Sequence, residues 1–170
     1  MNNQTNRGVS LVAIILLAGF VTEISAQRRP AGEAQVKQPM QVSLKVGSQT
    51  YQSSEPGSCT YAPVASIYQI VSEMWSVQQS QQARSLSLTF WKPKDGSGDM
   101  VTLTVRTGDA SHEVNTVRGG GATSGSGKAT FAKSGNGGTF TVDAKSKDGA
   151  PITGTISCST FARHAAEGGL

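Results

Sequence analysis

The sequence feature that most constrains the fold is the strict alternation of apolar and polar residues in several short segments. Residues 40–46 read MQVSLKV, in which every second residue is apolar. The same alternation occurs in residues 86–90 (LSLTF), 101–105 (VTLTV) and 140–144 (FTVDA). A period of two is the pattern of a β-strand with one buried and one solvated face. These segments therefore predict an all-β fold.

Turn-forming residues separate the predicted strands. Residues 93–98 (PKDGSG) and 147–151 (KDGAP) each contain the Asp-Gly pair that marks a β-hairpin. Further short strands are expected at residues 50–52, 112–117, 129–133 and 152–158. About seven short strands, with turns every ~8–12 residues, are typical of an antiparallel β-sandwich. We predict this fold class for residues 40–161.

Residues 63–82 fit two patterns. Ile67, Ile70 and Met74 have the spacing of a helical stripe, whereas Trp75 and Val77 have the spacing of a strand. We expect one short helix near residues 65–74, with a strand as the alternative.

The N-terminal residues 1–26 have the organisation of a secretory signal peptide. One cation, Arg7, precedes the apolar run 11–21, and the small residue Ala26 marks the expected cleavage point. An uncleaved anchor is the alternative, but a membrane-spanning helix needs roughly 20 apolar residues. We therefore predict a secreted or periplasmic protein with no transmembrane segment after cleavage.

The two ends of the remaining chain lack apolar periodicity. Residues 27–39 (QRRPAGEAQVKQP) are polar and contain Pro and Gly, and residues 162–170 (ARHAAEGGL) are similarly poor in core residues. Such segments bury too little surface to offset the entropy of ordering. We expect a flexible leader at 27–39 and a frayed tail at 162–170.

The chain contains two cysteines, Cys59 and Cys158. In an exported protein, cysteines pair when geometry lets them. The period of two places Cys158 on the same strand face as Ile156, which predicts an inward direction. We therefore expect one structural disulfide between Cys59 and Cys158.

The charge pattern bears on possible partners. The net charge is +4, and the cations are scattered singly along the chain. A nucleic-acid groove needs clustered cations, so we expect no nucleic-acid partner.

No catalytic, cofactor or metal motif is complete. Gly127-Lys128 lacks the glycine and hydroxyl of a phosphate-binding loop, and residues 95–99 (DGSGD) lack the further carboxylates of a calcium loop. The only histidines are His112 and His164, and neither adjoins a nucleophile motif. With both cysteines oxidised, a zinc site lacks ligands. We predict no enzyme activity, no cofactor and no metal.

Trp91 is the one candidate contact residue. It follows Phe90, so if Phe90 faces the core, Trp91 faces outward. An exposed tryptophan is a typical anchor for a partner. The alternative is that Trp91 lies over the end of the sheet beside Pro93.

The order of these segments resembles a known family. A signal, a polar leader, a strand, the first cysteine, a Gly-rich midsection, GGTFTVDAK at 137–145 and GTISC at 154–158 follow one another. This layout resembles small exported antigens of the mycobacterial 19 kDa lipoprotein type. The resemblance implies a disulfide-closed β-sandwich at the cell envelope without an enzymatic site. The lipid anchor of that family needs a cysteine at the mature N-terminus, which this sequence lacks.

The function expected from the sequence is therefore that of an exported, non-enzymatic interaction module. Its expected partner is an unidentified protein, glycan or lipid of the envelope. A secreted hydrolase that uses His112 is one alternative. A carrier that holds a small apolar ligand between its sheets is the other.

Overall fold

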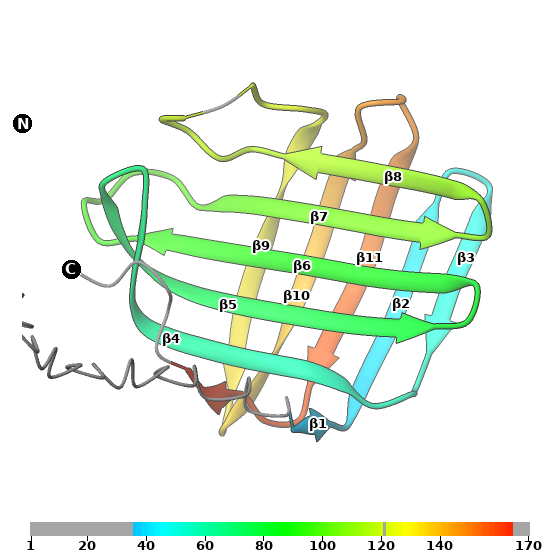
Figure 1. Ribbon diagram of the computed structural model, residues 1–170, viewed down its shortest axis with the longest axis horizontal. Helices are drawn as coiled ribbons and strands as arrows, with labels where there is room; N and C mark the ends of the chain where they lie inside the picture. The colour runs from blue at the N-terminus through cyan, green and yellow to red at the C-terminus, as the bar shows by residue number, and fades with distance from the viewer. Residues whose placement is uncertain (1–35, 121, 165–170) are drawn as a thin grey trace, which may run out of the picture. The chain divides into compact units, whose positions relative to one another are not determined.

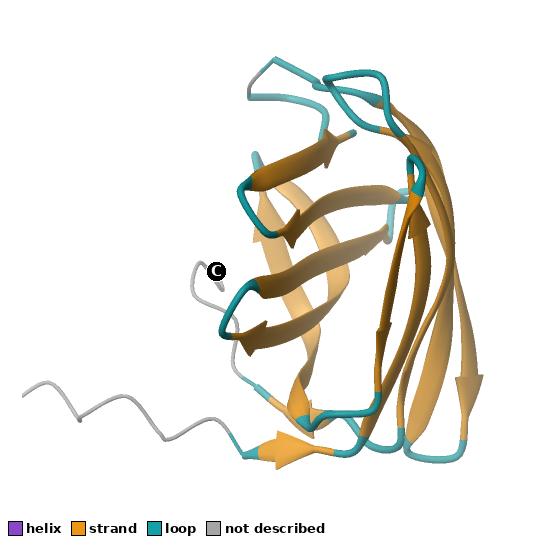
Figure 2. Cartoon of the chain, turned by 90° about the vertical axis from the view of Figure 1, so that its right-hand side faces the viewer, coloured by secondary structure: helices purple, strands orange, loops and turns teal. Residues whose placement is uncertain are grey.

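The computed structural model describes residues 36–120 and 122–164, and this part of the chain is all-β. Its strands form two sheets, of seven and five strands, and no helix occurs among the described residues. Figure 2 shows the two sheets as separate layers, with the strands of one running across those of the other. The predicted antiparallel β-sandwich is confirmed.

The larger sheet has the strand order β1-β4-β5-β6-β7-β8, and β12 also pairs with β4, in parallel. The strands are β1 Lys37–Gln38, β4 Gly57–Ile67, β5 Ile70–Gln81, β6 Arg84–Pro93, β7 Met100–Thr107, β8 Ala110–Asn115 and β12 Ala162–Arg163.

The smaller sheet has the order β3-β2-β11-β10-β9 and is antiparallel throughout. Its strands are β2 Met40–Val46, β3 Gln49–Ser53, β9 Ser126–Ser134, β10 Gly137–Lys145 and β11 Pro151–Cys158. In Figure 1 these strands run steeply behind the larger sheet. Packing of this kind joins two sheets through their inner faces.

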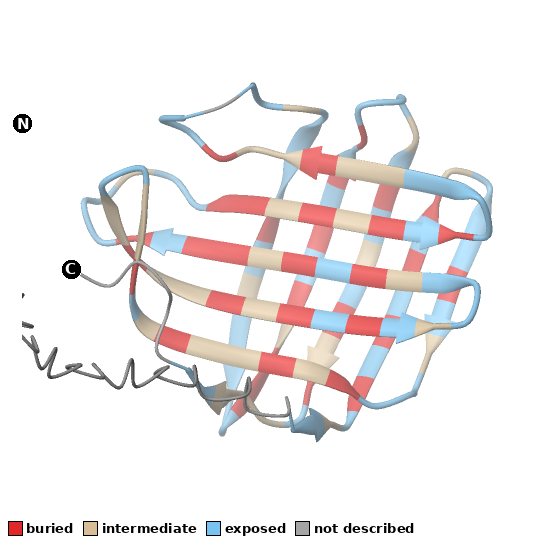
Figure 3. Cartoon of the chain, viewed as in Figure 1, coloured by how far each residue is buried: buried red, intermediate tan, exposed pale blue. Residues whose placement is uncertain are grey.

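The core lies between the sheets and follows the predicted alternation. Along β2, residues alternate strictly between buried and exposed, and the same banding is visible on most long strands in Figure 3. One contiguous cluster of buried side chains draws on both sheets, for example Leu88 of β6 and Ile156 of β11. Burial of a side chain of this size contributes about 1.5–3 kcal/mol.

The disulfide joins the two layers. Cys59 of β4 and Cys158 of β11 are bonded, and both are buried in the core cluster. The predicted pairing and the inward direction of Cys158 are confirmed.

The prediction of a short helix near residues 65–74 is wrong, and the strand alternative is confirmed. These residues form part of a β-hairpin in which β4 turns through Tyr68 and Gln69 into β5. The physical reason is that this end of the sheet is apolar on both faces. Trp75 and Val77 point into the core, while Met74 packs on the outer face. Apolar residues on both faces imitate the spacing of a helical stripe.

Of the two expectations for Trp91, an exposed contact residue and a side chain that lies over the sheet, its low exposure favours the second. Phe90 faces the core and Trp91 faces outward as expected, but Trp91 is only 8% exposed. A second apolar cluster covers it, with Met100 and Val117 buried beside it. The strand pattern predicted the direction of the side chain but not the segment that covers it.

The ordered domain extends past the predicted limits of 40–161. Lys37–Gln38 pairs with β4 in the segment expected to be a flexible leader, and Ala162–Arg163 pairs with β4 in the expected tail. Both short strands satisfy backbone groups along the edge of β4, which explains their order. Together with β4 and β5 they raise the strand number above the expected seven. The signal segment 1–26, residues 27–35 and residues 165–170 lie outside the described residues.

Residues 36–120 and 122–164 contain no helix that is long and apolar enough to span a bilayer.

Candidate functional site

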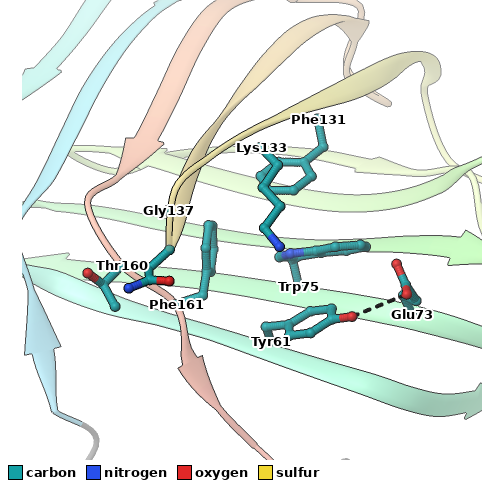
Figure 4. A pocket seen from close by; sticks show the side chains of 9 residues that line it. Tyr61, Glu73, Trp75, Phe131, Lys133, Gly137, Thr160 and Phe161 are labelled. Carbon is teal, nitrogen blue, oxygen red and sulfur yellow. Dashed lines mark hydrogen bonds between the residues drawn. The ribbon is translucent and has the colours of Figure 1, made fainter.

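A cleft opens at one edge of the sandwich, where β4 and β5 face β9 and β10. Its volume is about 450 Å³, within the ~300–1,000 Å³ common for small-molecule sites. Aromatic side chains form much of its wall, and these are Tyr61, Trp75, Phe131 and Phe161. Polar residues also line it, and these are Glu73, Lys133, Asn136 and Thr160. Figure 4 shows how they surround the cavity.

Trp75 is the centre of the aromatic wall. Tyr61 of the neighbouring strand and Phe131 of the opposite sheet flank it, each with its ring centroid 4.9 Å from that of Trp75. Trp75 is therefore only 7% exposed. Aromatic pairs at such distances stabilise one another by about 0.5–1.5 kcal/mol beyond their burial. The half-buried rings of Tyr61 and Phe161 offer accessible surface.

Phe161 is placed by the chain that leaves the disulfide. After Cys158 the backbone crosses from the smaller sheet to the larger one, where β12 pairs with β4. The Phe161 N–H donates to the Asn136 carbonyl at 2.9 Å, and the His164 N–H donates to the Tyr61 carbonyl at 2.9 Å. Phe161 meets Phe131 edge to face at 5.7 Å. This crossing segment forms one side of the cleft.

Glycine at two positions allows the part of the wall beside this segment to form. A Cβ atom at Gly138 would lie 2.5 Å from the Phe131 ring, so the absence of a side chain allows that ring to lie across the neighbouring strand. A Cβ atom at Gly137 would collide with the carbonyl oxygen atoms of Cys158 and Ser159. Both glycines therefore permit close approach rather than flexibility.

Tyr61 and Glu73 form the polar pair of the cleft. The Tyr61 hydroxyl donates to Glu73 Oε1 at 3.2 Å. Burial of the phenol, followed by the negative charge and hydrogen bond of Glu73, raises the pKa of Tyr61, while Arg163 opposes the rise. The phenol is therefore neutral at ordinary pH and acts as a hydrogen-bond donor.

His112 is paired with a carboxylate, a contact that the sequence does not predict. It lies on β8, its side chain is 14% exposed, and its Nδ1 lies 2.9 Å from Asp148 Oδ2 in the β10–β11 turn. Hydrogen bonding with Ser146, more than with His112, lowers the pKa of Asp148. The Ser146 hydroxyl also lies 3.0 Å from the Ala150 carbonyl, to which it donates.

This arrangement does not form a Ser-His-Asp triad. A triad needs the hydroxyl on the imidazole nitrogen that does not contact the acid. Here Ser146 lies beside the same carboxylate as His112 instead, and no hydroxyl or thiol bonds to His112 within residues 36–120 and 122–164. His164, the other histidine, follows β12, is exposed, and donates its backbone N–H to the Tyr61 carbonyl.

The hairpin turn at residues 95–99 also has a structural explanation. Asp95 Oδ1 accepts a hydrogen bond from the Ser97 N–H at 2.9 Å. Hydrogen bonding with the Ser97 side chain, and then with this N–H, lowers the pKa of Asp95. Arg118 Nη2 donates to the Gly98 carbonyl at 2.6 Å. In the described part of the chain, no three His, Cys, Asp or Glu residues gather as they would around a metal ion.

The aromatic cleft was missed at the level of sequence because its residues are dispersed over four strands and a crossing segment. Two signals were present. Tyr61 lies two residues after Cys59, so the period of two places both on one face of β4. Phe161 lies three residues after Cys158, close to the same disulfide.

Comparison with known proteins adds no relative. No family model, no curated protein and no solved structure matches this chain. The assignment of the cleft as a candidate site therefore depends on its geometry and chemistry.

Proposed function

We propose that this chain is an exported, non-enzymatic binding module and that the aromatic cleft is its ligand site. One observation carries the proposal: four aromatic side chains and four polar residues surround a cavity of about 450 Å³. Ligand sites typically combine an apolar wall with a few polar groups that orient the ligand.

The setting of the cleft supports this proposal. Two sheets joined by a buried disulfide hold its walls, and binding residues on a rigid scaffold lose little entropy when a ligand binds. A disulfide-joined core also suits an oxidising compartment, in line with the proposed secretion or periplasmic location. The resemblance to envelope antigens remains a proposal of the same kind.

The position of the cleft also bears on the carrier alternative. Large side chains such as Phe90, Phe140 and Leu103 fill the space between the sheets. A ligand held at the edge of the sandwich avoids this packed core. We therefore place the ligand in the cleft, within reach of solvent.

Native mass spectrometry tests the proposal. The full exported chain, purified from the periplasm or medium of its own host, should carry a bound small molecule. Phe161→Ala removes one wall of the cleft and should release that mass. Tyr68→Ala is the matched control, because Tyr68 is an aromatic residue that is 53% exposed and does not line the cleft. A bare mass for the wild type, or an unchanged adduct in Phe161→Ala, would overturn the proposal.

A further inference from the structure

We infer that the aromatic cleft takes a ring that carries a carboxylate group. This inference rests on the proposed function and names the chemical class of its ligand. Three features of the cleft support it: the direction of Lys133, the accessible donors around it and the position of the Glu73 carboxylate.

Lys133 faces the cleft although it is charged. Along β9 the inward face carries Ala129 and Phe131, and the period of two places Lys133 on that face as well. In Figure 4 its side chain extends over the aromatic wall toward Trp75. Across residues 36–120 and 122–164, no hydrogen bond or ion pair engages its ammonium group. An unengaged cation in an aromatic cleft favours an anion.

The indole of Trp75 supplies a second donor. Its Nε1–H has no hydrogen-bond partner among the described residues. Among those residues, Thr107 Oγ1 is the one side-chain nitrogen or oxygen atom that is buried without a partner, so the indole nitrogen of Trp75 is not buried. The indole nitrogen therefore remains accessible, although the ring is flanked on both sides. In Figure 4 this nitrogen and the Lys133 ammonium lie at the end of the wall that faces Phe161.

The carboxylate that lines the cleft lies away from these two donors. Glu73 is on the far side of Trp75 in Figure 4, where it accepts from Tyr61, and it forms no ion pair with Lys133. A carboxylate placed at Lys133 and Trp75 therefore meets donors, and charge-assisted hydrogen bonds of this kind are the stronger ones. A cationic ligand would instead meet the like charge of Lys133.

The remaining space suits a ring. The half-buried rings of Phe161 and Tyr61 border the cavity, and aromatic faces pack against flat or ring-shaped groups. Two classes of compound combine a ring with a carboxylate group, namely sugar acids and aromatic acids. Glu73 can accept from a sugar hydroxyl, which favours the sugar acid.

Nuclear magnetic resonance of the two indole N–H groups provides the test. The chain has two tryptophans, and Trp91 lies in the separate outer cluster, so its signal is an internal reference. Four probes are titrated into the full exported chain: glucuronate, glucose, benzoate and benzyl alcohol. We expect the acids to shift the Trp75 signal and the matched neutral compounds to leave it in place. Tighter binding of glucuronate identifies the ligand as a sugar acid, and tighter binding of benzoate identifies it as an aromatic acid.

A pair of charge variants tests the role of Lys133. Lys133→Gln should weaken binding of the acid by about tenfold, the effect of losing one hydrogen bond to a charged group. Lys128→Gln is the matched control, because Lys128 is likewise an exposed lysine of the same strand but does not line the cleft. It should leave the affinity unchanged.

The outcomes separate this inference from the proposed function. The inference of a carboxylate on the ligand is wrong if neutral and acidic probes shift the Trp75 signal equally, or if Lys133→Gln binds the acid as well as wild type does. In either case the cleft remains a ligand site. If no probe shifts Trp75, the inference also fails. The native mass spectrum of the wild type and Phe161→Ala then decides the proposed function independently.

Discussion

Cys59 on β4 and Cys158 on β11 link the two sheets through a disulfide whose Cα atoms lie 6.3 Å apart. The bond closes a loop with a sequence separation of 99 residues. Tyr61 and Phe161 follow the two cysteines closely in sequence, and both line the cleft. The disulfide therefore bears on both the stability of the sandwich and the geometry of the candidate site.

The double substitution Cys59→Ser and Cys158→Ser should lower the melting temperature substantially. Closing a loop of about 100 residues contributes at most about 4.7 kcal/mol, and measured losses are about 2–5 kcal/mol. Typical domains have a total stability of about 5–15 kcal/mol. Thermal unfolding of the exported protein checks this, and peptide mapping without reductant should show one linked pair. Free thiols on both residues in exported protein would contradict the prediction.

Gly138→Ala should destabilise the protein by about 1–3 kcal/mol, the usual cost of overpacking. The new methyl group would lie 2.5 Å from Phe131 Cε2 and 2.7 Å from the Ala132 carbonyl oxygen. Because Phe131 lines the cleft, ligand binding should weaken as well. Denaturant unfolding measures the first effect. Gly98→Ala is the control, since its nearest contact would be Arg118 Nη1 at 3.5 Å, and its stability should stay close to wild type.

The fold was predictable from the sequence where one face of a strand is exposed to solvent. β2, β6, β7 and β10 alternate between core residues and Ser, Thr, Gln or Lys for most of their length, so their period and inward faces were visible in the sequence. β4 and β5 were not, because Met74 and Ile67 pack on an outer cluster while Trp75 faces the core. Burial on both faces removes the alternation on which the prediction relies.

The candidate site was not predictable for a different reason. Tyr61, Phe131 and Phe161 come together only because two sheets and a crossing segment meet at one edge. Each of these residues, taken alone, is an ordinary core aromatic of a β-sandwich. The pairing of His112 with Asp148 was hidden in the same way, since β8 and the β10–β11 turn belong to different sheets.

Acid should weaken the contact between β8 and the β10–β11 turn. The pKa of Asp148 is lowered below its ordinary 3.8 by hydrogen bonding with Ser146 and then with His112. A carboxyl with a lowered folded pKa stabilises the fold above its unfolded pKa and loses that contribution as the pH falls through the folded value. Asp148→Asn should therefore be less stable than wild type at neutral pH, and the difference should shrink below pH 3.8.

Urea unfolding at several pH values measures this difference. Asp143→Asn is the control, because Asp143 is an exposed residue of β10 whose carboxylate makes no hydrogen bond or ion pair among the described residues. It should follow wild type across the acid range. A constant gap between wild type and Asp148→Asn at all pH values would contradict the role of the carboxylate charge.

Gln69→Gly should stabilise the protein by about 0.5–1 kcal/mol. The β4–β5 turn holds two residues other than glycine at positive φ, Tyr68 at 47° and Gln69 at 66°. Such a turn matches the twist of a hairpin but favours glycine and asparagine, and the left-handed conformation costs other residues about 1–2 kcal/mol each. The greater freedom of glycine in the unfolded chain cancels part of the gain.

Gln82→Gly provides the matched comparison for this turn. Gln82 occupies the two-residue turn between β5 and β6 and is not at positive φ. Glycine relieves no strain there and adds freedom to the unfolded chain, so the variant should be less stable than wild type. Opposite signs of the two changes in urea unfolding would locate the strain in the β4–β5 turn. Equal losses in both variants would show that Gln69 carries no strain that glycine relieves.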